Sequence, residues 1–318
     1  MTSLTTDTLA MSAQNQDQNG ISEPANSTQK RWFQRRGPRI AMALTGLLIV
    51  GIAGTLTFNV VSTRAHITSL ENAMIEGTAA TPGLSPAELA TRTAGLPEPV
   101  QRYFRFVFPE GVPDGLSYVE MEMEGMFRRP LTEGFAATTG RQVIDLAEPN
   151  LVFSADTTIV WPLWAIAYDS YTDGEMEMKA RVLSSLPVVD EVSTPALNRT
   201  SLRRWLLESP VYPMALLPGG PVRWEPVDEN RARAIVSAFG EEASLVATFD
   251  ERGALTRFDA EQDGDLTTPY HGSGEHVARG DYQMVQGMRL PHSFTIARAA
   301  GGEIFPFWEA RITSLRFE

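Results

Sequence analysis

Three charged residues lie among apolar neighbours, where a charge needs a partner. Asp169 stands between two tyrosines, and Arg204 and Glu208 flank Trp205. Residues four apart share one face of a helix, so Arg204 and Glu208 can form an ion pair there. Asp169 could join this pair, making either a buried ion network or a polar group that orients a ligand in an apolar pocket. A purely structural salt bridge is the alternative, because ion-pair networks also occur outside functional sites.

Large apolar side chains are concentrated around the same segment, and most of them would form the hydrophobic core. A curved sheet with apolar side chains on one face and a helix in its mouth can also enclose a cavity for an apolar ligand. The candidate ligand-binding residues that follow from these two patterns are Asp169, Tyr171, Arg204, Trp205, Glu208, Tyr212, Trp224 and Trp308.

Two further segments have some features of metal sites. Residues 259–265 place oxygen ligands at positions 1, 3, 5 and 7 of a calcium loop with glycine at position 6, but position 12 lacks the bidentate glutamate. His271 and His276, with Glu275 and Asp281, could hold zinc or iron, but their spacing in a Gly/Ser-rich loop fixes no geometry. We therefore predict an acidic inter-strand loop, exposed histidines, and neither a metal nor a cofactor.

Glu120, Glu122 and Glu124 alternate with apolar residues and would project about 7 Å apart from one face of a strand. Closely spaced carboxylates can support acid–base catalysis, but solvated glutamates on an outer sheet face are far commoner. The sequence contains no nucleophile elbow, Walker loop, dinucleotide fingerprint or H-E-x-x-H motif. Whether the chain is an enzyme is therefore left open by its sequence.

The N-terminal region predicts a membrane anchor. Residues 1–39 are polar, predict disorder, and end in a basic cluster from Lys30 to Arg39. Residues 40–61 carry no charge, and a helix of this length spans about 33 Å, enough for the hydrocarbon core. The basic cluster places the N-terminus in the cytoplasm and the rest of the chain outside it, as a single-pass protein of the cell membrane. A cleaved signal peptide is the alternative, since residues 63–65 resemble a cleavage site, but the apolar stretch is too long for one.

Composition excludes several classes of function. The formal net charge is −12, and the segment after residue 66 carries 21 basic and 36 acidic residues, so a nucleic-acid partner is disfavoured for that segment. The chain contains no cysteine, which excludes disulfides, thiolate metal sites and cysteine nucleophiles.

The residues after the anchor predict one β-rich domain. A juxtamembrane linker over 62–84 precedes a capping box at Ser85, and apolar spacing predicts helices that begin near Pro99 and cover about 195–208. Period-two alternation predicts strands, with hairpin turns near residues 250–253 and 301–302. The clearest alternation is found at residues 119–124, 175–182 and 288–296. The predicted fold class is α+β over residues 85–318: a mainly antiparallel, curved, half-barrel-like sheet with a few packed helices, behind a transmembrane helix.

Several collinear segments carry a family resemblance. They are Leu96–Tyr103 (L-P-E-P-V-Q-R-Y), 169–174, 204–208, 212–218 (containing A-L-L-P), 222–227 (V-R-W-E-P-V), 287–291 (G-M-R-L-P) and 305–308. In order and spacing this set resembles an uncharacterised family of bacterial membrane-anchored domains of unknown function. The resemblance implies a β-rich unit, often behind an anchor, similar in general form to the curved-sheet carriers of lipoproteins and lipids.

These features together favour a non-catalytic binding module. We expect a membrane-anchored extracytoplasmic domain that holds a hydrophobic or lipid-like ligand between the curved sheet and the helix at 195–208. One alternative is an envelope hydrolase that uses Asp169 or Glu208 as general base, with His271 or His276 as the next candidates. Another is a scaffold that presents an edge or an acidic face to another protein. The sequence identifies neither the ligand nor a protein partner.

Overall fold

The computed structural model describes residues 27–129, 132, 134–262, 264 and 275–318. The chain forms two compact units, Met1–Gly54 and Thr55–Glu318. In the first unit the described residues belong to helix α1 (Ser27–Gly77), and the side chains of residues 39–54 are almost all exposed. Between Arg39 and Gly77 this helix is long and apolar enough to be a candidate membrane span.

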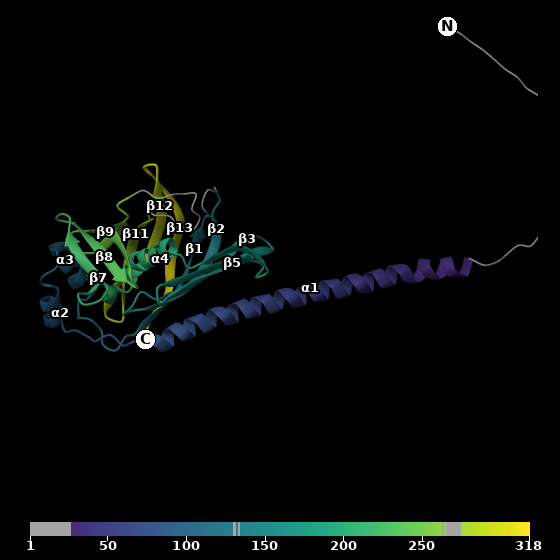
Figure 1. The fold of residues 1–318 in the computed structure, drawn as a ribbon, viewed down its shortest axis with the longest axis horizontal. Helices are drawn as coiled ribbons and strands as arrows, with labels where there is room; N and C mark the ends of the chain where they lie inside the picture. Colours follow the sequence, from purple (N-terminus) through teal and green to yellow (C-terminus); the bar gives the residue numbers. More distant parts are fainter. Residues whose placement is uncertain (1–26, 130–131, 133, 263, 265–274) are drawn as a thin grey trace, which may run out of the picture. The chain divides into compact units, whose positions relative to one another are not determined.

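The second unit is built on one antiparallel sheet of 13 strands that does not close (Figure 1). The strand order is β6-β5-β4-β3-β2-β1-β13-β12-β11-β10-β9-β8-β7. The strands are β1 (Tyr118–Phe127), β2 (Ala136–Asp145), β3 (Leu151–Val160), β4 (Leu163–Thr172), β5 (Glu175–Val182), β6 (Leu186–Val192), β7 (Val222–Pro226), β8 (Arg231–Ala238), β9 (Glu241–Phe249), β10 (Leu255–Asp259), β11 (Glu275–Val285), β12 (Met288–Ala300) and β13 (Glu303–Phe317).

The first and last strands are neighbours in the middle of this sheet, where Val119 pairs with Phe317. Gly125 permits their close approach, because a Cβ there would lie 2.1 Å from the Glu309 carbonyl oxygen. The two edge strands, β6 and β7, are joined by helix α4 (Pro195–Glu208) and two short 3-10 helices, η1 (Ser209–Val211) and η2 (Pro213–Leu216).

Helix α4 lies on one face of the sheet and the sheet curves around it. It begins at the N-cap Thr194, whose side chain accepts a hydrogen bond from the Leu197 backbone, and proline occupies the first turn. It contacts β4 and β5 from one half of the sheet and β8 and β9 from the other, although seven strands separate these two pairs in the strand order. A sheet can reach one helix from both halves only if it is curved, so α4 lies on the concave face (Figure 1).

Two more helices and the end of α1 complete this unit. Helices α2 (Pro86–Thr93) and α3 (Glu98–Val107) pack against each other, and α3 also contacts β8, β9 and β12. Ser85 forms the predicted capping box at the start of α2. On the convex face, Met74 of α1 packs with Val143 and Val152.

The predicted fold class is confirmed: the domain is α+β, with an open, curved antiparallel sheet and few helices. The helix predicted over 195–208 coincides with α4, and the alternating segments are strands β1, β5 and β12. The predicted hairpin glycines Gly253 and Gly301 have positive φ angles of 96° and 62°.

Candidate functional site on the concave face

The three charged residues singled out in the sequence meet beneath α4. Arg204 Nη1 donates to Asp169 Oδ2 at 2.5 Å, and Arg204 Nε donates to Glu208 Oε1 at 2.9 Å. A fourth residue completes the network, because Gln142 Nε2 donates to Glu208 Oε2 at 2.5 Å. Asp169, Glu208 and Gln142 are buried, whereas a quarter of the Arg204 side chain is exposed. The network therefore reaches solvent at Arg204.

Strand register and helix periodicity bring this network together. Asp169 of β4 pairs with Phe153 of β3, and Phe153 pairs with Gln142 of β2, so the three side chains form one row across the concave face. Arg204 and Glu208 lie one turn apart on α4, above this row. The Arg204 guanidinium also stacks over the Phe153 ring, 4.8 Å from its centroid.

A second guanidinium, that of Arg279, is buried nearby on β11. Its Nη2 donates to the carbonyl oxygen of Leu207 at 3.1 Å, and its guanidinium lies 5.2 Å from the centroid of the Phe294 ring. Burial lowers the pKa of Arg279 below its ordinary value, although Glu208 acts in the opposite direction. For Arg204, burial also lowers the pKa, but the Glu208 and Asp169 carboxylates outweigh it and raise the pKa overall. Both guanidinium groups are thus cations held in an apolar environment.

Five buried donors on this side of the sheet make no hydrogen bond within the described part of the chain. They are Tyr103 Oη, Tyr171 Oη, Trp205 Nε1, Arg279 Nε and Trp308 Nε1. Buried polar groups in folded proteins are nearly always paired, and each exception needs an explanation such as an absent water, ion or ligand. Each of these groups could donate to an acceptor atom of a water molecule or of a ligand.

The other two predicted aromatic residues have partners of their own. Tyr212 Oη donates to the carbonyl oxygen of Trp205 at 2.5 Å, and Trp224 Nε1 donates to that of Leu216 at 3.1 Å. Burial and the Glu208 charge raise the pKa of Tyr212 far above its usual range, so its hydroxyl stays protonated. Tyr212 and Trp224 therefore hold the segment after α4 in place.

Trp308 is the centre of an aromatic cluster at one end of the concave face. Its ring centroid lies 5.5 Å from that of Phe127, 5.8 Å from that of Phe153 and 6.4 Å from that of Phe294. Arg204 stacks on Phe153 and Arg279 stacks on Phe294, so both guanidinium groups contact this aromatic cluster. Aromatic side chains beside a small number of hydrogen-bond donors are typical of ligand sites.

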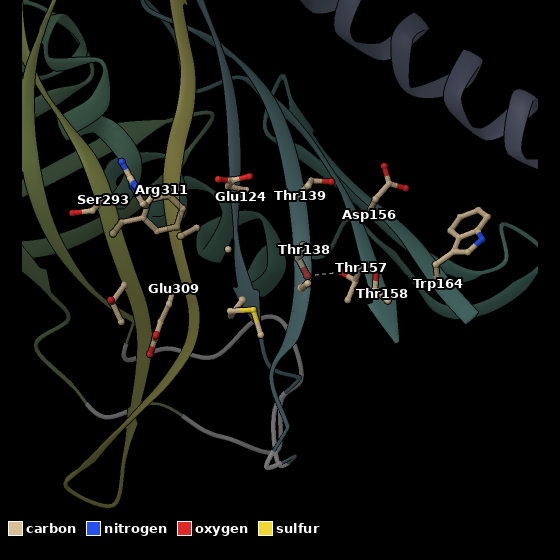
Figure 2. A pocket seen from close by; sticks show the side chains of 16 residues that line it. Glu124, Thr138, Thr139, Asp156, Thr157, Thr158, Trp164, Ser293, Glu309 and Arg311 are labelled. Carbon is tan, nitrogen blue, oxygen red and sulfur yellow. Dashed lines mark hydrogen bonds between the residues drawn. The ribbon is translucent and has the colours of Figure 1, made fainter. Parts of the chain in front are cut away.

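A separate hollow lies on the opposite face of the sheet (Figure 2). It has a volume of about 770 Å³ and is lined by residues of β1 to β4, β12 and β13. Side chains such as Glu124, Thr139 and Asp156 alternate with buried residues, so they point away from α4. Thr138 and Thr157, which are linked by a 2.9 Å hydrogen bond, also line the hollow (Figure 2). The hollow is broad and open to solvent, and sequence periodicity gave no signal for it.

The candidate metal ligands are engaged elsewhere or lie outside the described residues. His276 Nδ1 lies 2.7 Å from Asp259 Oδ1, and Glu275 pairs with Arg203 at 2.7 Å, so these side chains do not converge. His271 and the calcium-loop positions 263 and 265 lie outside the described residues. Among the residues that are described, no group of three or more histidine, aspartate or glutamate side chains is arranged to hold a metal ion.

Of the carboxylates considered for catalysis, Glu208 and Glu120 are paired with protein donors. Both oxygens of Glu208 accept hydrogen bonds, from Arg204 and Gln142. On the convex face, Glu120 pairs with Arg141 at 3.2 Å, and Glu122 is exposed. Glu208 thus belongs to a hydrogen-bonded network on the concave face, whereas Glu122 on the convex face is exposed to solvent.

Sequence reasoning did not single out Gln142 and Arg279. Each is a polar residue at an inward position of a strand, where Gln142 alternates with Ile144 and Arg279 with Val277. That alternation is the signal that could have identified them, since a polar side chain at an inward position must find a partner.

The fold and its concave site define an open, curved-sheet domain with a helix across its mouth. The chain belongs to a family of unknown function (DUF6920), whose model matches residues 94–317. No curated protein matches this chain in sequence.

Solved structures resemble the chain only distantly. A LolA superfamily protein from Nitrosomonas europaea has a TM-score of 0.33 and 8% identity, covering 69% of this chain and 92% of its own. A DUF1329 family protein from Desulfovibrio piger has a TM-score of 0.34 and 11% identity, covering 64% and 86%. A beta-barrel-like DUF1849 protein from Brucella abortus has a TM-score of 0.23 and 11% identity, covering 64% and 98%. Because these similarities are distant, the fold of this chain is defined by its own strand order.

Proposed function

We propose that residues 85–318 form an extracytoplasmic domain that binds a hydrophobic or lipid-like ligand on its concave face, and that residues 40–61 anchor it in the cell membrane. The observation that carries the proposal is the set of five buried donors on the α4 side of the sheet that have no hydrogen-bond partner in the described part of the chain. A ligand with an apolar body and a few acceptor oxygens would satisfy these donors while its body contacts the aromatic cluster.

The charged network gives such a ligand an orientation. Arg204 is the exposed member of the network, and Arg279 carries a donor without a partner in the described chain. An acidic or ester head group would lie near these guanidinium groups, because they are the cations of the concave face that contact the aromatic cluster. The acyl or other apolar part would extend along Phe127, Phe153 and Trp308.

The anchor and its direction are part of this proposal. The basic cluster between Lys30 and Arg39 precedes the uncharged stretch, and such clusters remain on the cytoplasmic side. Residues 1–39 would then be a cytoplasmic tail and residues 62–84 would connect the span to the domain.

Ligand binding is tested first with the compact unit Thr55–Glu318, which includes the end of α1 that packs on the sheet. Native mass spectrometry and lipid extraction should find a co-purifying apolar molecule. After delipidation, a dansyl-labelled fatty acid should bind with saturable stoichiometry and quench tryptophan emission. A folded unit with neither extractable lipid nor saturable binding would contradict the proposal.

Two tryptophan substitutions separate a ligand contact from a structural one. Trp308→Phe removes an indole donor that has no partner in the described chain, whereas Trp224→Phe removes a donor bonded to the Leu216 carbonyl. We expect Trp308→Phe to weaken probe binding roughly 5- to 10-fold, the value of one hydrogen bond. Trp224→Phe should lower stability and leave probe affinity unchanged. Equal effects of both variants on affinity would remove Trp308 from the site.

A further inference from the structure

Two neighbouring hairpin tips expose apolar side chains at one end of the sheet. At the end of β3 and in the turn to β4, Val160 is 60% exposed and Trp161 is 88% exposed. At the start of β6, directly after the turn from β5, Leu186 is 63% exposed and Val188 is 58% exposed. We call these two hairpin ends, residues 159–163 and 183–188, the apolar tips.

The apolar tips form one continuous surface. The Leu183 backbone amide donates to the Trp164 carbonyl oxygen at 2.9 Å, which joins the second tip to the first hairpin. No charged residue occurs in residues 157–168 or 182–189. Large apolar residues scattered singly on a surface are ordinary, but an uncharged, contiguous group with a tryptophan at its apex marks an interaction site.

Contacts with α1 define the level of the apolar tips along that helix. Asn59 of α1 donates from Nδ2 to Ser185 Oγ, in the second tip, at 3.0 Å. Asn59 lies in the last turn of the uncharged stretch 40–61, and Arg64, the first charge after that stretch, pairs with Asp156 at 3.1 Å. The tips are therefore level with the point where the apolar part of the helix ends.

We propose that the apolar tips insert into the outer headgroup region of the bilayer that holds α1, with Trp161 as the interfacial side chain. Tryptophan favours the membrane interface, because its ring is largely apolar and its N–H can bond to headgroups or water. This inference rests on the anchor proposed above and adds a second, peripheral contact between the domain and lipid.

The contact bears on how a ligand would reach the concave face. Phe127, which packs on Trp308, is the last residue of β1. In an antiparallel sheet this residue lies at the same end as the end of β3, where the first apolar tip begins. Insertion of the tips thus turns the aromatic end of the concave face towards the bilayer, so an apolar molecule could pass between them without crossing much water.

Site-specific labels test the proposal in the full chain. The chain contains no cysteine, so single-cysteine variants can be labelled with an environment-sensitive dye at one position each. Trp161→Cys and Leu186→Cys report on the tips. Phe239→Cys is the control, because Phe239 is also apolar and exposed but lies beside Gly174, at the opposite end of β4. The proteins are reconstituted in phosphatidylcholine nanodiscs, with and without a lipid that carries a quencher near its headgroup.

We expect the headgroup quencher to reduce emission about twofold at positions 161 and 186, because these labels would lie at the depth of the headgroups. Emission at position 239 should not change. Equal quenching at all three positions would overturn the proposal. So would labels at 161 and 186 that are shielded from water but not quenched, which would indicate a second copy or a protein partner.

A fourth label separates failure of this inference from failure of the anchor. Leu47→Cys lies inside the uncharged stretch and should be quenched by a lipid with its quencher deep in the acyl chain. Quenching at 47 without quenching at 161 and 186 overturns the tip contact and leaves the anchor. No quenching at 47 overturns both.

Discussion

Removing the Glu208 carboxylate should destabilise the domain by about 3 kcal/mol, because two buried donors lose their acceptor. Glu208 accepts from Arg204 at 2.9 Å and from Gln142 at 2.5 Å, and its side chain is only 8% exposed. Hydrogen bonds to charged groups contribute about 1.5–3 kcal/mol each, and breaking a buried ion pair costs about 3–5 kcal/mol. In Glu208→Ala, Arg204 still has Asp169 and partial access to water, so the lower end of this range is expected.

An exposed ion pair of the same spacing provides the control. Glu98 pairs with Arg102 four residues later on α3, and the Glu98 side chain is 59% exposed. Glu98→Ala should cost less than about 1 kcal/mol. Urea unfolding of the Thr55–Glu318 unit, followed by tryptophan emission, measures both losses. Equal losses would refute the reasoning, since burial would then make no difference to the value of the pair.

A conservative variant separates the contribution of the Glu208 charge to stability from that of its packing. Glu208→Gln keeps the shape of the side chain and one acceptor oxygen but removes the charge. We expect about 1–2 kcal/mol of destabilisation, because the one remaining oxygen can still accept from Arg204, whereas the new amide group faces the Gln142 donor, and Arg204 keeps Asp169 as a carboxylate partner. If Glu208→Gln is as destabilising as Glu208→Ala, the charge itself, rather than the packing, holds the network together.

Two other expectations concern orientation and pH. Alkaline phosphatase fused after Glu318 should be active if the domain is extracytoplasmic, and an inactive fusion in an expressed protein would reverse the proposed orientation. Burial raises the pKa of Asp259, but hydrogen bonds from His276 and Arg257 outweigh it and lower the pKa overall. The resulting stabilisation is present above the unfolded pKa of about 3.9 and is lost as the pH falls through the folded value. Asp259→Asn should therefore reduce stability at neutral pH and flatten its decline in acid, and an unchanged acid profile would contradict this.

The fold was largely predictable because its signals are local. Period-two alternation identified β1, β5 and β12, and apolar spacing predicted a helix over about 195–208, where α4 is found. Strand order was not predictable, because nothing local requires β1 to pair with β13 rather than with a nearer strand. That pairing joins segments about 190 residues apart in the chain and requires the close approach at Gly125.

The candidate site was predictable in part, for a related reason. Asp169, Arg204 and Glu208 were conspicuous as charges among apolar residues, and they do meet. Gln142 joins them through strand register, which no spacing along the chain reveals. Which aromatic N–H and O–H groups stay without partners is likewise set by three-dimensional packing: Trp205 and Trp224 are both buried, but only Trp224 faces a backbone carbonyl within the described chain.

The central position of the first and last strands has a consequence for biogenesis. Strands β1 to β6 and β7 to β13 are each hairpin arrays that can form from sequence neighbours, but the sheet becomes one piece only when β13 reaches β1. Such distant pairing is slow to form, and it leaves the central edge of β1 open until β13 has been synthesised. Until β13 pairs with β1, the chain consists of two half-sheets with exposed central edges, a state that is prone to aggregation.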